Sequence, residues 1–159
     1  DCRHGPFTLE TSGVREFLSL VQVFSPNEAE ALALTGRRDL DEAIADLAAL
    51  CPTVVVKCGS LGASGIDRGR HFDVAAPSVE IVDTVGAGDA FNAGFLAGVL
   101  WESGFDECVR LAVAAGTLST LGAGSSTLPD AAELTAFAAH LPHPAQLPTG
   151  LACLALLSP

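Results

Sequence analysis

The residues with the most distinctive chemistry form a glycine-rich heptapeptide, Asp-Thr-Val-Gly-Ala-Gly-Asp, at positions 83–89. It follows a strand-like run at 79–82 and precedes a long apolar run at 90–101. A glycine-rich turn that leads into a helix directs unpaired backbone N–H groups and the positive end of the helix dipole at one point, which suits a phosphate. Asp89 would then lie in the first helical turn, beside that phosphate. This arrangement predicts phosphoryl transfer.

The same heptapeptide also has a purely structural interpretation. Asp is a common helix cap and glycine a common turn residue, so the segment can simply mark a loop that enters a helix. The flanking sequence favours a functional role, because two further segments occur upstream, at 26–30 (Pro-Asn-Glu-Ala-Glu) and at 54–63 (Val-Val-Val-Lys-Cys-Gly-Ser-Leu-Gly-Ala). No Gly-x-x-x-x-Gly-Lys-Ser/Thr motif occurs in the sequence, which argues against a P-loop kinase.

Together with Asp83–Phe91, these segments resemble the carbohydrate kinase family that includes ribokinase, fructokinase and 2-keto-3-deoxygluconate kinase. The three blocks have the order of the family and compatible spacing. The resemblance implies ATP-dependent transfer of a phosphoryl group to a hydroxyl of a small sugar or sugar acid. It also implies an α/β fold, the C-terminal portion of a three-layer α/β/α ribokinase-like sheet that is mainly parallel.

The resemblance also predicts how the chain is organised. Family members are longer and carry an N-terminal half that supplies most sugar contacts and a lid, so we expect this chain to correspond to a C-terminal portion, either an isolated piece or an incomplete gene product. Residues 1–140 would form the ATP-binding and catalytic part of the domain. Residues 141–159 are rich in proline and then apolar, do not resemble the family, and have no predicted placement. A homodimer of the full-length protein would form through the lid.

The resemblance assigns roles within the heptapeptide. Asp89 matches the catalytic base, which would orient the acceptor hydroxyl and accept its proton. Gly86, Ala87 and Gly88 would form an anion hole of backbone N–H groups for the phosphate. A side chain at either glycine would obstruct the backbone angles or the approach of the phosphate, so we expect both to be intolerant of substitution.

The segment at 26–30 has two interpretations. Asn27 and Glu30 lie three residues apart, so on a helix they share a face and could order the water shell of Mg²⁺. Alternatively, Asn27 caps its helix and Glu30 completes a capping box. The resemblance favours the functional role, because the family's Asn-x-x-Glu motif serves magnesium and phosphate.

Further contacts with ligands are implied by the resemblance. The segment Lys57–Gly62 resembles a loop that contacts the nucleotide phosphates and ribose, and Lys57 is the one lysine of the chain. The implied ATP-binding residues are Asn27, Lys57, Gly59, Ser60, Gly62 and Thr84. The family often holds a monovalent cation, such as K⁺, near the anion hole; the matching groups are Asp83, the carbonyl of Val85, Ser119, Gly122, Gly124 and Thr127.

Hydrophobic periodicity predicts the elements that position these residues. We expect helices at 10–21, 27–34, 40–50, 90–102, 106–121 and 129–140. We expect strands at 22–24 and 53–57, a hairpin of 65–67 with 72–74, and a strand that ends at Thr84. Gly94 and Gly98 would let their helix pack closely against the sheet. Ligands of such sheets gather at the carboxyl ends of strands, where the segments at 26–30 and 83–89 both fall.

Composition limits the partners. Eight Lys and Arg against nineteen Asp and Glu give a net charge of −11, which opposes binding to nucleic acid or an anionic membrane. No apolar run reaches the ~20 residues that span a bilayer. ATP would bind through backbone amides and a divalent ion. Five cysteines without a Cys-x-x-Cys pair are typical of a reducing compartment, and we expect a cytoplasmic protein.

Two alternatives to a sugar kinase stay open. The chain could bind a nucleotide without turnover, because the sugar-binding half is missing. It could also belong to a nucleoside kinase or a vitamin-precursor kinase of the same superfamily, which the heptapeptide does not exclude. The residues that select the acceptor are expected in the absent half.

Overall fold

A computed structural model describes residues 7–123 and 129–141. The chain divides into two compact units. The first contains the residues up to Cys58 together with Ser64–Phe72, and the second contains Gly59–Ala63 and the residues from Asp73 onward. Each unit is described by itself. The tail at 142–159, whose placement the sequence left open, lies outside the described residues.

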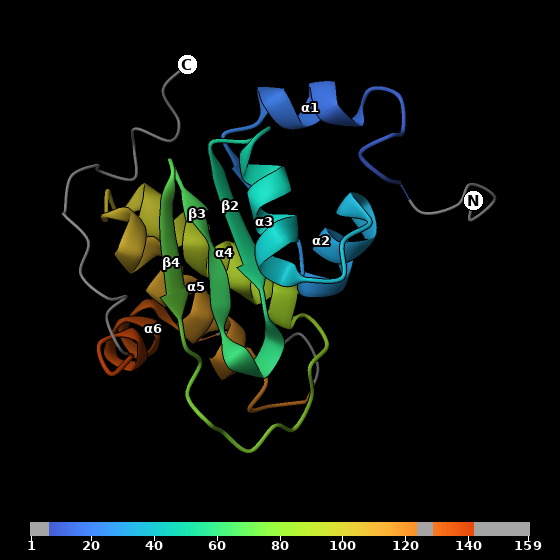
Figure 1. The fold of residues 1–159 in the computed structure, drawn as a ribbon. Coiled ribbons are helices and arrows are strands. Elements are labelled where there is room, and N and C mark those ends of the chain that lie inside the picture. Colours follow the sequence, from blue (N-terminus) through green and yellow to red (C-terminus); the bar gives the residue numbers. More distant parts are fainter. Residues whose placement is uncertain (1–6, 124–128, 142–159) are drawn as a thin grey trace. The chain divides into compact units, whose positions relative to one another are not determined.

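Four strands form one mixed sheet in the order β1–β2–β3–β4 (Figure 1). β1 (Val23–Phe24) pairs in parallel with β2 (Thr53–Lys57). β3 (Ala63–Asp67) and β4 (Arg70–Val74) form the predicted hairpin, each somewhat longer than expected. Their two linking residues, Arg68 and Gly69, have φ values of 47° and 84°, which are typical of a tight type I′ turn. The α/β class predicted from the sequence is confirmed.

The first unit contains three helices, α1 (Val14–Leu20), α2 (Glu28–Thr35) and α3 (Leu40–Ala48). α3 is amphipathic, and the predicted inward-facing residues Ile44 and Leu47 are 2% and 0% exposed. They belong to a hydrophobic cluster with the buried valines of β2. This cluster explains why β2 forms where the run of β-branched residues predicted it.

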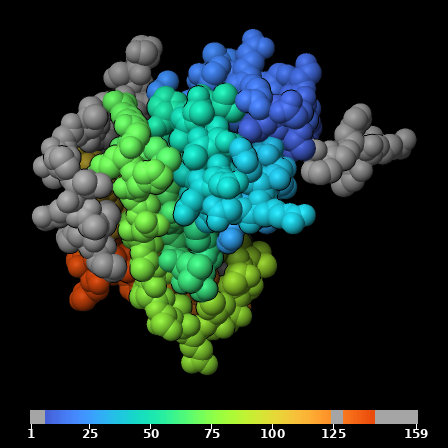
Figure 2. Space-filling view, viewed as in Figure 1, coloured from blue at the N-terminus to red at the C-terminus, as the bar shows by residue number. Residues whose placement is uncertain are grey.

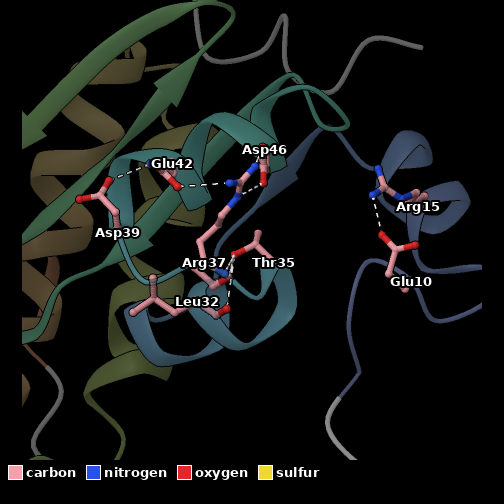
Figure 3. A network of polar contacts seen from close by, with 9 residues as sticks. Glu10, Arg15, Leu32, Thr35, Arg37, Asp39, Glu42 and Asp46 are labelled. Atoms are coloured by element: carbon pink, nitrogen blue, oxygen red, sulfur yellow. Dashed lines mark hydrogen bonds and ion pairs between the residues drawn. The ribbon is translucent and has the colours of Figure 1, made fainter.

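A polar network connects α2 and α3 within this unit (Figure 3). Arg37 lies in the link between the two helices, and its guanidinium donates to Asp46 (2.6 Å) and to Glu42 (3.2 Å). The hydrogen bond from Arg37 lowers the pKa of the Asp46 carboxyl. Asp39 caps the start of α3 by accepting the N–H of Glu42. The network therefore fixes where α3 begins.

The second unit contains α4 (Ala87–Leu100), α5 (Phe105–Ser119) and α6 (Ala131–Ala138), preceded by a short 3₁₀ turn at Gly59–Leu61. α4 and α5 pack tightly against each other. A Cβ at Gly94 would lie 2.5 Å from the carbonyl oxygen of Leu111, and one at Gly98 would lie 2.8 Å from the Cα of Cys108. The expectation that these glycines pack against the sheet is therefore wrong, because they allow α5 to approach α4.

The strand predicted to end at Thr84 does not form. A strand needs a partner for its backbone, and the N–H groups of Val82 and Asp83 donate instead to the carbonyl of Thr120, at the end of α5 (2.8 and 3.3 Å). Ile81 and Val82 are 50% and 61% exposed. The segment between β4 and α4, yellow-green in Figure 2, lies at the surface.

Of the helices formed by residues 7–123 and 129–141, none has the length and apolar character needed to cross a membrane.

Candidate functional site

The glycine-rich heptapeptide forms the loop that enters α4. Gly86 is the residue that caps this helix, with φ 84° and ψ −3°, a left-handed conformation that favours glycine. Two hydrogen bonds shape the loop before it: a carboxylate oxygen of Asp83 accepts the N–H of Val85 (3.0 Å), and the carbonyl of Thr84 accepts the N–H of Ala87 (3.2 Å). The glycine is thus needed for the turn itself, whatever ligand the loop binds.

Asp89 is the third residue of α4, and its side chain is exposed. Within the part of the chain that the structure describes, its carboxylate has no hydrogen-bond partner, and α4 has no side-chain cap. Asp89 therefore does not act as the helix cap that the structural interpretation required. The backbone N–H groups of Gly88 and Asp89 also have no partner there. Unpaired donors and a free carboxylate thus share one helical turn.

The other members of the predicted anion hole differ from one another. The N–H of Ala87 already donates to Thr84, whereas that of Gly86 has no partner among the described residues. The donors that are ready for an anion are therefore those of Gly86, Gly88 and Asp89. Sequence reasoning missed the N–H of Asp89, although the first turn of any helix leaves such donors unsatisfied.

The groups predicted to hold a monovalent cation lie near the end of α5 where the structure describes them. Asp83 lies against this end, since its N–H donates to Thr120. Ser119 is buried, and its hydroxyl donates to the carbonyl of Gly116 (2.9 Å). Gly122 follows α5 by three residues, and Gly124 and Thr127 lie outside the described residues. Sequence reasoning missed Thr120, although the last carbonyls of a helix characteristically need donors from outside it.

Asn27 and Lys57 meet at the carboxyl ends of the parallel strands β1 and β2. A backbone bridge joins the two residues, and the N–H of Lys57 donates to the carbonyl of Pro26 (2.9 Å). This is the strand-end position predicted for Asn27. The Lys57 side chain is half-buried and has no partner among the described residues. Its ammonium group is therefore available for an anionic ligand.

Asn27 and Glu30 form a capping box at the start of α2. The Asn27 side chain accepts the N–H of Glu30 (2.8 Å), and a carboxylate oxygen of Glu30 accepts the N–H of Asn27 (2.8 Å). The structural interpretation of this pair therefore describes the geometry, while its role toward Mg²⁺ stays a prediction. Among the described residues, no group of three or more His, Cys, Asp or Glu side chains could hold a metal ion.

The residues Gly59, Ser60 and Gly62 surround the 3₁₀ turn. Ser60 is exposed, and Gly59 has a φ of 57° with open space where its Cβ would lie. Gly62 differs, because its Cβ would lie 2.0 Å from the carbonyl oxygen of Val74. Gly62 is thus required by backbone packing, whereas Gly59 and Ser60 are exposed, and the contacts of all three with a nucleotide stay predictions.

Comparison with known proteins identifies the family. The family model "pfkB family carbohydrate kinase" matches residues 6–131. Ribokinase of Haemophilus influenzae is 36% identical over 132 residues, which are 79% of this chain and 43% of that protein. Cytidine kinase of Thermococcus kodakarensis is 41% identical over 101 residues, 62% of this chain and 36% of that protein.

The fold agrees with these sequence matches. The structure of Arabidopsis thaliana ribokinase in complex with ribose and ATP is similar to this chain with a TM-score of 0.70 and 30% identity, over 78% of this chain and 43% of that one. The ribokinase-like fold predicted from the sequence is therefore confirmed. The chain spans less than half the length of the curated relatives it matches. On the matched sequence and the shared fold, the chain belongs to the pfkB family of carbohydrate kinases.

Proposed function

We propose that the chain is the ATP-binding and catalytic part of a kinase that phosphorylates a hydroxyl of a small sugar or sugar acid. The observation that carries this proposal is the first turn of α4, where unpaired N–H groups and the free Asp89 carboxylate occur together. Ribokinase relatives, one of them solved with ribose and ATP, support the donor and the class of acceptor. Because the chain spans less than half of these relatives, the activity of the whole protein is part of the proposal.

The nucleotide fits the donors of this turn. The N–H groups of Gly86, Gly88 and Asp89, with the positive end of the α4 dipole, would hold the terminal phosphate and stabilise the charge that develops during transfer. Lys57, Gly59 and Ser60 would contact the remaining phosphates and the ribose, and Thr84 would flank them. Gly62 would support this loop through its packing.

The Asp89 carboxylate would orient the acceptor hydroxyl and accept its proton. In a loose transition state the proton leaves late, so alignment contributes as much as basicity. The exposed position of Asp89 leaves the carboxylate open to an incoming sugar. The reaction would then move the γ-phosphoryl group from ATP to the sugar oxygen, with the proton passing to Asp89.

Magnesium would enter with the phosphates of ATP, since Mg²⁺ keeps several waters and is bound through few carboxylates. It would neutralise charge on the phosphate oxygens. Asn27 and Glu30 are exposed at the start of α2, and the second carboxylate oxygen of Glu30 has no partner in the described part of the chain. That oxygen would orient a water of the magnesium shell.

A monovalent cation is proposed beside the loop. The backbone of Asp83 lies against the carbonyl end of α5, where the helix dipole is negative, so the potential there favours a cation. The carbonyl of Val85, together with Ser119 and Gly122, would complete the site. A cytoplasmic location is likewise a proposal, supported by the reduced state of the described cysteines Cys51, Cys58 and Cys108, which form no disulfide.

The catalytic assignment is tested with Asp89→Asn in the full-length gene product, using Mg-ATP and a panel of sugars, sugar acids and nucleosides. We expect kcat to fall at least ~10²-fold, because the change removes both the base and the alignment. Asp41→Asn is the matched control, since Asp41 is an exposed carboxylate in the first turn of α3. Undiminished activity of Asp89→Asn across the panel would refute the role.

A nucleoside kinase is the second candidate, favoured by the 41% identity to a cytidine kinase. The same panel decides it: a kcat/KM for nucleosides above that for every sugar would replace the sugar proposal. A protein that binds ATP but transfers to no acceptor, and regains transfer when an N-terminal half is supplied, would instead be a nucleotide-binding module.

A further inference from the structure

Both ends of the heptapeptide contact one helix, α5, which lies beside α4 (Figure 1). At the first end, the carbonyl of Thr120 accepts the N–H groups of Val82 and Asp83. At the other end, a Cβ built on Gly116 would lie 3.3 Å from the carbonyl oxygen of Ala87, in the first turn of α4. Thr120 caps the end of α5 with helical backbone angles, and Gly116 precedes it by four residues, so the two lie on one side of the helix.

The contact at Thr120 is fixed within α5 itself. The backbone N–H of Thr120 donates to the carbonyl of Thr117 (3.0 Å), and its hydroxyl donates to the same carbonyl (2.7 Å). Thr120 is also buried. The start of the heptapeptide is therefore bound to a residue that is itself held in place by hydrogen bonds. The distance between α5 and the first turn of α4 is not set by these bonds.

Gly116 sets that distance. A methyl group there would lie tightly against the carbonyl oxygen of Ala87 at 3.3 Å, so this turn of α4 would have to move by a few tenths of an ångström. Its distance of 3.5 Å to the Cβ of Phe91 would be an ordinary contact. The turn that would move carries the N–H groups of Gly88 and Asp89 and the Asp89 carboxylate. These are the groups that the proposed function directs at the nucleotide and the acceptor.

We propose that Gly116 is a positioning residue. Because it has no side chain, the first turn of α4 can pack closely against α5, and this packing orients the N–H groups of Gly88 and Asp89 and the Asp89 carboxylate toward the phosphoryl group. The proposal rests on the proposed function. Gly116 would act through the backbone of Ala87 and would not itself touch the ligand.

Gly98 provides a matched control on the same interface. Its Cβ would overlap α5 more strongly, at 2.8 Å from the Cα of Cys108. However, it lies nine residues beyond Asp89, about 13 Å farther along α4. Gly98→Ala therefore disturbs the packing of the two helices at a distance from the loop, whereas Gly116→Ala disturbs it directly beneath the loop.

The experiment compares the two variants with the unchanged protein by three measurements: the melting temperature, the affinity for a nonhydrolysable ATP analogue with Mg²⁺, and the amide shifts of Gly86, Gly88 and Asp89 in nuclear magnetic resonance. We expect Gly116→Ala to shift these amides and to weaken the affinity about tenfold. Its melting temperature should stay near that of the unchanged protein, because alanine favours the helix and offsets the strain. Gly98→Ala should lower the melting temperature and leave the amides and the affinity unchanged.

The outcomes separate the positioning role from the proposed function. If the unchanged protein binds no nucleotide, the proposed function fails, while the amide shifts of the free protein still decide the positioning role. Loop amides that stay in place in Gly116→Ala would overturn it. Parallel losses of stability and affinity in both variants would also overturn it, because they would reveal general packing only.

Discussion

Glycine is required at position 62 by the conformation and packing of the backbone. Its φ is 104°, and a Cβ there would overlap the carbonyl oxygen of Val74 and the nitrogen of Ala76. Sequence comparison placed it with Gly59 in a nucleotide loop, but the two differ in what surrounds them. A glycine pattern cannot distinguish a position that needs space for a ligand from one that needs space for its own chain.

We predict that Gly62→Ala lowers the free energy of unfolding by about 3 kcal/mol, because it adds steric overlap to backbone strain. Urea unfolding measures the loss. Gly69→Ala is the control, since Gly69 has a φ of 84° but open space around its Cβ position, and should cost about 1 kcal/mol. Equal losses in the two variants would show that overlap at Gly62 has no energetic consequence.

Arg110 is a buried cation that the sequence did not single out. It is 3% exposed, and its guanidinium pairs with Glu107 and donates to the carbonyls of Ala138 and Leu141, the latter at 3.1 Å. It thereby closes the C-terminal end of α6, where carbonyls lack partners and the helix dipole favours a cation. A lone arginine within an apolar helix pattern does not reveal such a partner 28 residues away.

At the level of elements, Arg110 should hold α6 on α5. We predict that Arg110→Met lowers the free energy of unfolding by about 2–3 kcal/mol, because the carbonyls of Ala138 and Leu141 lose the buried guanidinium that donates to both. The loss in free energy of unfolding for Arg110→Lys should lie between zero and that of Arg110→Met, since an ammonium group cannot donate to two carbonyls in the planar geometry of a guanidinium. Arg15→Met removes an exposed ion pair with Glu10 and a hydrogen bond to the carbonyl of Leu9 (3.1 Å), and should cost only about 1 kcal/mol. Chemical denaturation would show the proposal wrong if Arg110→Met matched Arg15→Met.

The elements themselves were predictable where local pattern and packing agree. The β-branched run of β2 and the amphipathic pattern of α3 gave correct elements, because burial on a sheet or a helix face imposes the same periodicity that the sequence shows. The strand at 79–84 was not correct, although its pattern is similar. The N–H groups of this segment donate to a carbonyl at the end of α5 instead of to a neighbouring strand. The local sequence does not determine which hydrogen-bond acceptor lies nearby in the folded chain.

The start of α4 shows the same limit within the site. From the sequence we expected this helix to begin at residue 90, because Ala87 and Gly88 belong to a glycine-rich segment that is typical of a turn. In the structure the turn ends at Gly86, which has a left-handed conformation, and the helix begins at Ala87. The role proposed for Asp89 follows from its place beside glycines and from the family resemblance, and it stays a prediction. That its carboxylate makes no capping bond within residues 7–123 and 129–141 supports this role, and this feature was visible only in three dimensions.

For the whole molecule, the −11 net charge leaves backbone amides and few cations to attract a nucleotide. Mg-ATP should stabilise the folded protein by mass action, by about 2.7 kcal/mol at a concentration one hundred times Kd. Thermal melts with Mg-ATP, and with magnesium alone as the control, measure this effect. A melting temperature that does not move with saturating Mg-ATP would contradict nucleotide binding.

The stability of the molecule should also depend on alkaline pH through Cys51. Burial raises the pKa of this thiol above its ordinary value, and hydrogen bonding with the backbone of Thr53 and Phe24 only partly offsets that effect. Because the folded thiol keeps its proton where the unfolded one ionises, the stabilisation is fully present below the unfolded pKa and is lost as the pH rises toward the folded one. Urea unfolding from pH 8 to 10 should show a steeper decline than in Cys51→Ala. Identical slopes would exclude the effect.

The box at the start of α2 implies a competition. One carboxylate oxygen of Glu30 accepts the N–H of Asn27. A metal ion that bound this oxygen directly would break the hydrogen bond and destabilise the first turn of α2 by about 1 kcal/mol. Direct binding of the metal ion would then be coupled to fraying of this turn. An ion held through water on the other oxygen leaves the turn intact, so exchange of the Asn27 amide with solvent distinguishes the two modes.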